Sequence, residues 1–290
     1  MIISKSIISG IDLGPDTEKV ISYTAYFAAK TRAEVRLLYV IDYLMTPPSY
    51  LAAYIDEEKR REESEMEEWK VKLKEEGIKA ESEIVLGHLH ESFVKVIEEE
   101  SPELLVIGYQ SHMLRPSSSE RLIKSLQIPM LVVRGRFADK AVPGPVSIRN
   151  ILCPVDFSEN SRHAISAAKE LASLFSADLH LCHVIPSHLL KEKKAVWKSL
   201  GKEDREKFDD TMRLEAESQF VLLCNEYGID NGGEIFHGAP ASVISSISEE
   251  REYDLIVMGA RGLSYMQTVL IGSTTEAVLK TSPCPVLIVH

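Results

Sequence analysis

The chain has 290 residues, of which 44% are hydrophobic and 27% are charged, and 44 Asp and Glu against 33 Lys and Arg give a net charge of −11. The length suits about two domains, the composition excludes a mainly disordered chain, and no apolar run reaches the roughly 20 residues of a membrane-spanning helix. The acidic balance argues against a protein that grips nucleic-acid phosphates, so we expect neither nucleic acid nor membrane as a partner.

The chain opens on the apolar residues Met1–Ile8. They lack the basic region, the long apolar stretch and the small-residue cleavage site of a secretory signal. We interpret them as a first strand and expect a cytoplasmic protein.

The segment Asp56–Glu76 is dense in Glu, Lys and Arg and carries Met66, Trp69 and Leu73 at helical spacing. Glu-to-Lys pairs four residues apart support a solvated helix. The pattern predicts a surface helix with a narrow apolar stripe, and a helix that docks a partner is the alternative.

The sequence repeats itself. An apolar run that ends in aspartate occurs at Ile7–Asp12 and again at Ile151–Asp156, an offset of 144 residues. An acidic residue, four apolar residues and a glycine occur at Glu103–Gly108 and again at Asp254–Gly259. A repeat of this length indicates two copies of one domain.

A linker separates the two copies. Residues 135–148 contain Pro143-Gly144-Pro145 near their middle, and proline and glycine at this density are typical of a connecting segment. We expect a first domain over residues 1–136 and a second over residues 149–290.

Each half alternates short β-branched runs with longer amphipathic stretches, which indicates a parallel sheet covered by helices on both faces. The fold predicted for each half is therefore a doubly wound α/β domain. Asn160 and Ser161 are candidates to cap the first helix of the second half. In that half the predicted strands are 150–156, 178–185, 233–237, 254–259 and 285–289, and the predicted helices are 160–175, 190–227 with one break allowed, 240–251 and 273–282.

Cysteine and histidine give no sign of a metal site. His88 and His90 lie two residues apart without a third ligand nearby in the sequence, which favours a solvated loop. The cysteines fit neither a zinc spacing nor a CxxC redox motif, so we interpret them as buried thiols. They are Cys153, Cys182, Cys224 and Cys284.

The loops after the first and fourth strands of the second half form the candidate site, because ligands of an open parallel sheet bind where the strand order reverses. The first loop begins at Pro154, Val155 and Asp156. The second begins at Met258 and has the spacing Gly-x2-Gly-x9-Gly-Ser-Thr. Its motif residues are Gly259, Gly262, Gly272, Ser273 and Thr274.

This spacing can build a phosphate cradle. Gly259 and Gly262 let the backbone approach a ligand and tolerate positive φ, although ordinary turn chemistry also explains glycines in a loop. The segment 272–274 opens a helix, whose free N–H groups and positive dipole end attract phosphate.

Other side chains suit the rest of a nucleotide. A strand-end carboxylate such as Asp156 can hydrogen-bond ribose hydroxyls. Val155 and Val184 can supply an apolar floor for a purine. Arg261 either offsets phosphate charge or is simply solvated.

With these motifs, the second half resembles a universal stress protein domain, and the whole chain resembles a tandem universal stress protein. The resemblance also rests on His183-Val184 and on the closing run Ser282–Val289. It implies a five-stranded parallel sheet of order 3-2-1-4-5 in each half and ATP bound at the ends of the first and fourth strands. Its implied ligand residues are Asp156 for the ribose, Val155 and Val184 for the adenine, and Gly259, Gly262, Gly272, Ser273 and Thr274 for the phosphates. ATP, with or without Mg²⁺, is the expected cofactor, with AMP or ADP as alternatives.

The first half departs from the motif. Tyr-Gln-Ser follows Gly108, Pro116 replaces the third glycine, and Gly10 replaces the proline before the aspartate, while Asp12 and Val40 remain. We expect that the first half does not bind ATP as the second does, although Ser117–Ser119 could hold a single anion at a helix start.

Three functions stay open at this point. The first is a nucleotide-binding stress or regulatory protein, the second is a slow ATPase or adenylyl-transfer enzyme that uses the same pocket, and the third is an interaction protein with a vestigial pocket. No Walker A spacing, no strained G-x-S-x-G turn and no acid–base pair stands out, so we predict no catalytic residue.

The expected partners follow from the sheet edges. The last strand of each half is an edge, and edges are paired or covered. The resemblance implies that edge strands pair between domains, so we expect the two halves to pair within one chain. A homodimer of chains and an unidentified protein partner remain open.

Overall fold

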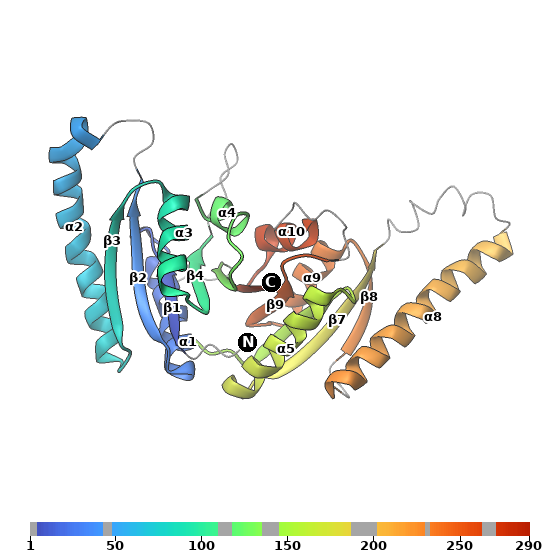
Figure 1. Cartoon of the computed structure of the whole chain (residues 1–290). Coiled ribbons are helices and arrows are strands. Elements are labelled where there is room, and N and C mark those ends of the chain that lie inside the picture. Colours follow the sequence, from blue (N-terminus) through green and yellow to red (C-terminus); the bar gives the residue numbers. More distant parts are fainter. Residues whose placement is uncertain are drawn as a thin grey trace. The chain divides into compact units, whose positions relative to one another are not determined.

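The computed structural model describes residues 5–42, 48–109, 118–134, 145–186, 202–229, 233–262 and 271–290. The chain divides into two compact units, an N-terminal unit of Met1–Ser147 and a C-terminal unit of Ile148–His290. Figure 1 shows the strands and helices of both units, and each unit is described by itself.

The N-terminal unit is a parallel sheet of order β3-β2-β1-β4-β5. Its helix α2 runs alongside the edge strand β3 (Figure 1). In chain order its elements are β1 (Ser6–Gly10), α1 (Thr17–Thr31), β2 (Glu34–Ile41), α2 (Pro48–Glu75), β3 (Ala80–Leu86), α3 (Leu89–Glu100), β4 (Leu104–Gly108), α4 (Ser118–Ile123) and β5 (Met130–Val133).

The C-terminal unit repeats this topology with the order β8-β7-β6-β9-β10, again with parallel neighbours. The predicted order 3-2-1-4-5 and the doubly wound α/β class are confirmed. Its elements are β6 (Asn150–Val155), α5 (Glu159–Phe175), β7 (Asp178–Pro186), α8 (Lys202–Tyr227), β8 (Gly233–Gly238), α9 (Pro240–Glu250), β9 (Leu255–Gly259), α10 (Ser273–Thr281) and β10 (Val286–Val289).

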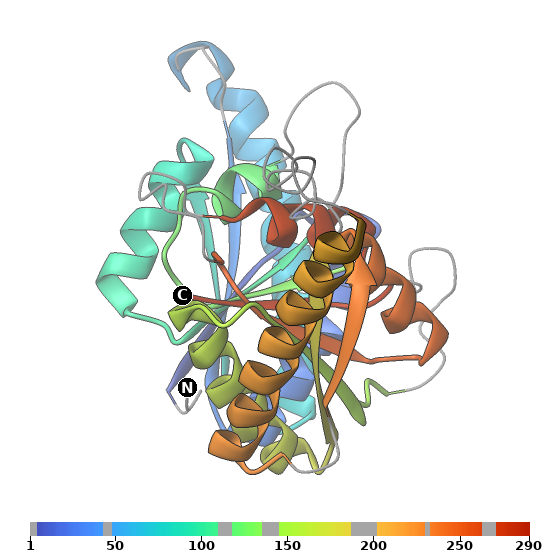
Figure 2. The same ribbon diagram turned by 90° about the vertical axis from the view of Figure 1, so that its right-hand side faces the viewer.

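The handedness of the crossovers distributes the helices over two faces. From β6 the chain steps outward through β7 to β8, and it then crosses back through β9 to β10. Right-handed crossovers therefore place α5 and α8 on one face of this sheet and α9 and α10 on the other. Figure 2 shows α8 lying along β7 and β8.

The central strands are buried on both faces, as their continuous apolar runs require. Every residue of β9 is buried, and so are residues 151–155 of β6. The four cysteines are buried thiols, as predicted, and none of them forms a disulfide. Burial raises the pKa of Cys153 and raises that of Cys182 to about 12, so these groups stay protonated thiols.

The cap of α5 differs from the prediction. Ser158, not Asn160 or Ser161, is the N-cap, and its side chain accepts a hydrogen bond from the Ser161 N–H. The preceding residue, Phe157, has a left-handed φ of 65°, which turns the chain early and starts the helix at Glu159.

Helix α2 is longer than the predicted segment, but its apolar stripe behaves as expected. Met66 and Leu73 are each 1% exposed, and α2 packs against β2 and β3. The Lys72 ammonium lies 4.0 Å from the centre of the half-buried Trp69 ring. The sheet of the same unit thus covers the stripe.

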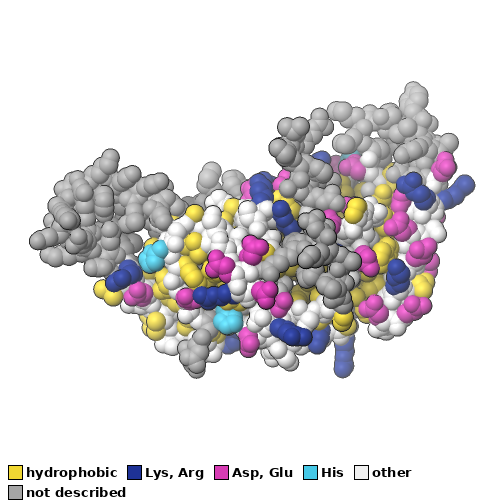
Figure 3. Space-filling model, turned by 180° about the vertical axis from the view of Figure 1, so that it is seen from behind, with side chains coloured by type: hydrophobic (Ala, Val, Ile, Leu, Met, Phe, Trp, Pro, Cys, Tyr) yellow, Lys and Arg dark blue, Asp and Glu magenta, His cyan; other side chains and the backbone are white. Residues whose placement is uncertain are grey.

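The described surface mixes charges of both signs. On the face shown in Figure 3, acidic and basic side chains are interspersed among hydrophobic ones. Within the described ranges, no helix is long and apolar enough to cross a bilayer.

Candidate functional site

One cavity of the C-terminal unit collects all eleven residues that the sequence singled out. It has a volume of about 590 Å³ and lies at the carboxyl ends of β6, β7 and β9, where the strand order reverses. The predicted residues that line it are Pro154, Val155, Asp156, Val184, Met258, Gly259, Arg261, Gly262, Gly272, Ser273 and Thr274.

Asp156 is held by a network of short hydrogen bonds. Its Oδ1 atom accepts from the Ser158 N–H at 3.2 Å and from the hydroxyls of Ser158 and Ser161, each at 2.6 Å. The Asp156 N–H donates in turn to the Ser161 Oγ atom at 3.1 Å. Whereas Oδ1 accepts from the two serines, the Oδ2 atom lies close against Gly262.

Of the two reasons expected for Gly259 and Gly262, positive φ is wrong and close approach to a ligand stays a prediction. Gly259, Gly262 and Gly272 are absent from the residues with positive φ in the described chain. A Cβ atom on Gly259 would meet the Asn160 Cβ at 2.8 Å and its carbonyl carbon at 2.9 Å, and one on Gly262 would collide with the Asp156 Oδ2 atom. These two glycines allow close approach between parts of the protein itself.

The start of α10 faces the cavity. Gly272 is its N-cap residue, with φ −70° and ψ 154°, and the Gly272 N–H donates to the Ala260 carbonyl at 2.8 Å. Thr275, which the sequence analysis missed, is 3% exposed and donates its hydroxyl to the Gly259 carbonyl at 3.0 Å. Ser273 is exposed and Thr274 half-buried, so their hydroxyls and the first N–H groups of α10 border the opening.

Helix α8 supplies a wall that the sequence analysis did not foresee. Glu215, Ala216 and Gln219 line the cavity from this helix. No local motif marks them, because they reach the site only through the packing of α8 on β7 and β8.

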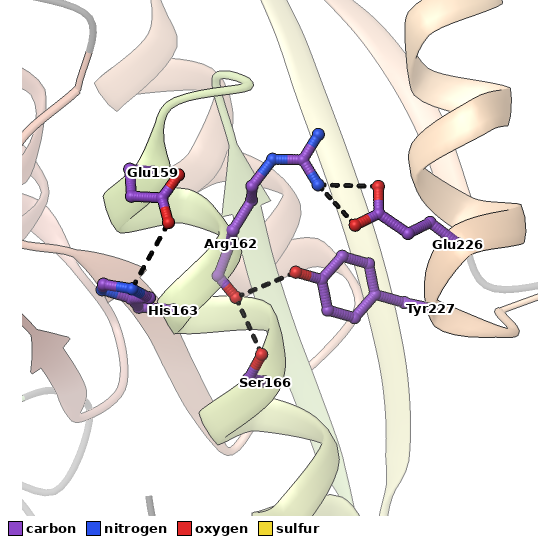
Figure 4. A network of polar contacts seen from close by, with 6 residues as sticks. All are labelled: Glu159, Arg162, His163, Ser166, Glu226 and Tyr227. Atoms are coloured by element: carbon purple, nitrogen blue, oxygen red, sulfur yellow. Dashed lines mark hydrogen bonds and ion pairs between the residues drawn. The ribbon is translucent and has the colours of Figure 1, made fainter.

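The C-terminal end of α8 is tied to α5 (Figure 4). The Arg162 Nη1 atom lies 2.6 Å from both carboxylate oxygens of Glu226, and the Tyr227 hydroxyl donates to the Arg162 carbonyl at 3.5 Å. Lys169 donates to the Tyr227 carbonyl as well. These contacts fix the helix whose middle forms the wall.

His183 and Phe157 also line the cavity. The two rings lie 4.4 Å apart between centres at an angle of 39°, and the His183 Nδ1 atom is 2.8 Å from the Val155 carbonyl oxygen. Burial lowers the pKa of His183, and its contact with that carbonyl and the nearby Asp156 charge only partly oppose this shift.

The N-terminal unit keeps the aspartate turn. The Asp12 Oδ1 atom accepts from the Gly14 N–H at 3.0 Å and from the Thr17 hydroxyl at 3.5 Å. Leu13 follows with φ 53°, as Phe157 follows Asp156 in the other unit.

The N-terminal unit differs beside that turn. Phe93, on α3, is 4% exposed, and its ring lies only 2.7 Å from where a Cβ atom on Gly10 would stand. Ile244 lies at the matching place on α9 and borders the cavity. Tyr109 donates to Glu120 at 2.8 Å, and the Arg134 guanidinium lies 4.9 Å from the centre of the Tyr109 ring. The segment around Pro116 and Ser117 lies outside the described residues.

The histidines considered as metal ligands do not form a cluster. His88 precedes α3, and its Nδ1 atom lies 3.6 Å from Asp42. Across the described ranges, no group of three or more His, Cys, Asp or Glu side chains is placed to hold a metal ion.

Comparison with known proteins agrees with the fold and with the motif. The family model of the universal stress protein family matches residues 4–134 and again 147–290. Two universal stress proteins of Methanocaldococcus jannaschii are similar to about half of the chain. One is 29% identical over 147 residues and covers 49% of this chain and 81% of its own length, and the other is 30% identical over 155 residues and covers 50% and 96%.

A solved structure resembles the whole chain. The crystal structure of a universal stress protein from Archaeoglobus fulgidus has a TM-score of 0.69 at 23% identity and covers 98% of this chain and 96% of that one. This likeness concerns the fold, and the two family matches extend over nearly the full sequence. The chain therefore belongs to the universal stress protein family and contains two copies of that family's domain in tandem.

Proposed function

We propose that the C-terminal unit binds an adenine nucleotide, with ATP as the expected ligand, and that the protein acts as a nucleotide-binding stress or regulatory protein. The observation that carries this proposal is the single cavity lined by all eleven motif residues. Its volume of about 590 Å³ lies within the range of cofactor and small-molecule sites.

Each part of the nucleotide has a complementary part of the cavity. The N-terminus of α10, with Gly272, Ser273 and Thr274, suits the phosphates because free N–H groups and the helix dipole stabilise negative charge. Arg261 adds a positive side chain on that border. Any Mg²⁺ would arrive bound to the phosphates themselves.

The other end of the cavity suits a nucleoside. Asp156 lines the cavity and its carboxylate is fixed through Oδ1, so the carboxylate can accept a hydrogen bond from a ribose hydroxyl. Pro154, Val155, Val184 and Met258 present apolar surface for the adenine ring. The family resemblance implied these roles for Asp156, Val155 and Val184.

We further propose that the N-terminal unit does not bind ATP in this way. The Phe93 ring occupies the space above Gly10, next to the retained Asp12 turn. We place the domains at residues 1–136 and 149–290, in a cytoplasmic protein whose halves pair with each other.

The direct test is to denature the freshly purified protein, identify the released nucleotide by chromatography and measure ATP binding by calorimetry. We expect about one nucleotide per chain. Asp156→Asn should weaken ATP binding roughly tenfold or more, because the loss of one charged hydrogen bond costs about 1.5–3 kcal/mol.

Asp12→Asn is the matched control, because it makes the same change in the same turn of the other unit. It should leave ATP binding unchanged. Two nucleotides per chain would refute the assignment to one unit, and no binding of added ATP with Mg²⁺ would favour an interaction protein with an empty pocket.

A further inference from the structure

His183 is a buried polar side chain that lines the cavity and to which the family resemblance assigned no role. It is 8% exposed, lies on β7 and pairs in register with Val155 on β6. The ring packs on Phe157, and its Nδ1 atom is 2.8 Å from the Val155 carbonyl.

This contact selects one tautomer of the ring. A carbonyl oxygen only accepts hydrogen bonds, so Nδ1 must carry the proton. Burial lowers the pKa of His183, so the ring is neutral near pH 7 and Nε2 keeps its lone pair. Among the residues that the structure describes, none hydrogen-bonds this Nε2 atom.

The position of the ring points to a ligand hydroxyl. His183 and Asp156 border the same cavity, and the Asp156 charge acts on the histidine ring. A ribose carries two neighbouring hydroxyls, each able to donate one hydrogen bond. The carboxylate and the unprotonated Nε2 atom belong to two residues that line one cavity, and both are acceptors of the kind that such a diol needs.

We propose that His183 determines specificity for a ribonucleotide, its Nε2 atom accepting a hydrogen bond from one ribose hydroxyl while Asp156 accepts from the other. This inference deepens the proposed function and rests on it. It adds a requirement that adenine and phosphate contacts alone do not impose, namely a ligand with both hydroxyls.

The central test compares His183→Asn with the wild type. The Asn amide can take the place of Nδ1 and donate to the Val155 carbonyl, but it offers no group at Nε2. The wild type should bind ATP roughly 3- to 10-fold more tightly than either 2′-deoxy-ATP or 3′-deoxy-ATP, the effect of one hydrogen bond. In His183→Asn, the preference over one of these analogues should disappear.

The matched control is His180→Asn on the same strand, whose ring contacts Tyr253 and does not line the cavity. It should keep both preferences. If His183→Asn binds ATP as tightly as the wild type, or weakens all three nucleotides equally, the histidine has only a structural role and the inference is wrong.

A second measurement needs only the wild type. The wild type should bind both 2′-deoxy-ATP and 3′-deoxy-ATP more weakly than ATP, because each analogue lacks one of the two hydroxyls from which Asp156 and His183 would accept. Equal affinity for ATP and either analogue overturns the inference even if the variant fails to fold. If the wild type binds no ATP, the proposed function fails first and the inference with it.

Discussion

The three motif glycines differ in what a methyl group would meet. At Gly259 the nearest atoms belong to Asn160 on α5, including its backbone carbonyl carbon at 2.9 Å. At Gly272 nothing lies closer than 3.5 Å, and φ is −70°. Gly259 is required by the protein's own packing, whereas a methyl group on Gly272 would make only ordinary van der Waals contact with the backbone of residues 260–262.

This difference predicts opposite phenotypes for two alanine variants. Gly259→Ala should destabilise the ligand-free protein by about 1–3 kcal/mol, because a backbone atom stands in the way. Gly272→Ala should leave the stability nearly unchanged and weaken ATP binding, because the new methyl group stands where the phosphates would approach the N–H groups.

Denaturant unfolding without nucleotide and calorimetry with ATP measure the two effects. Equal stability losses in both variants would contradict the argument. Full ATP affinity in a folded Gly272→Ala protein would show that the phosphates lie elsewhere.

The sequence identified these glycines but not their reason. Positive φ, one of the two expected reasons, is wrong, because the described glycines with positive φ are Gly77, Gly228 and Gly238. Close approach to a ligand, the other reason, stays a prediction. What a missing Cβ atom avoids depends on Asn160, about 100 residues earlier in the chain, and no local pattern reveals that contact.

At the scale of the element, α8 links the cavity to the rest of the C-terminal unit. Its middle lines the cavity, and its end is fastened to α5 through Arg162, Glu226 and Tyr227 (Figure 4). Phe220 and Leu223 are buried and hold the helix on the sheet. The α8 wall is therefore attached to the sheet mainly by apolar contacts, and the polar contacts at the end of the helix adjust its position.

Arg162→Ala should therefore have a small effect on stability, within about 1 kcal/mol, because its side chain is 37% exposed. The same change should speed ATP dissociation several-fold, since the wall formed by Glu215, Ala216 and Gln219 loses part of its support. Stopped-flow release of a fluorescent ATP analogue measures this rate.

Lys59→Ala is a suitable control, because it removes an exposed ion pair with Glu63 on α2 of the other unit. Its dissociation rate should equal that of the wild type. An unchanged rate in Arg162→Ala would mean that the apolar contacts alone fix the wall.

Alternation of strands and helices was sufficient to predict the described elements of the C-terminal unit within one or two residues, and positions 190–201 of the predicted helix lie outside the described residues. Short apolar runs between amphipathic stretches leave few other interpretations. The contribution of α8 to the cavity could not be predicted, because polar residues such as Glu215 and Gln219 resemble those of any solvated helix face.

At the scale of the molecule, the two units share one topology but differ at the carboxyl edge of the sheet. In one unit a cavity lies beside Ile244, and in the other the Phe93 ring fills the space over Gly10. The departures of the first half from the glycine motif were visible in the sequence. The side chain that fills the space was not, because Phe93 lies in a stretch with no motif.

Saturating ATP should therefore protect one unit selectively. At 100 times the dissociation constant, a ligand stabilises the state that binds it by about 2.7 kcal/mol. We expect slower amide hydrogen exchange in β6, β9 and the start of α10, and little change in β1 and β4. Mass spectrometry of peptic fragments resolves the two units, and equal protection of both would contradict one-sided binding.

The turn after the first strand adopts the same unusual backbone conformation in both units. Leu13 and Phe157 both have left-handed φ values, 53° and 65°, although neither is a glycine. A side chain in this region costs roughly 1–2 kcal/mol, yet the turn persists in the unit whose glycine motif is degenerate. The conformation therefore belongs to the fold and does not depend on a ligand. Asp156 is therefore preorganised: the cost of orienting its carboxylate is part of the free energy of folding and does not reduce the affinity for a nucleotide.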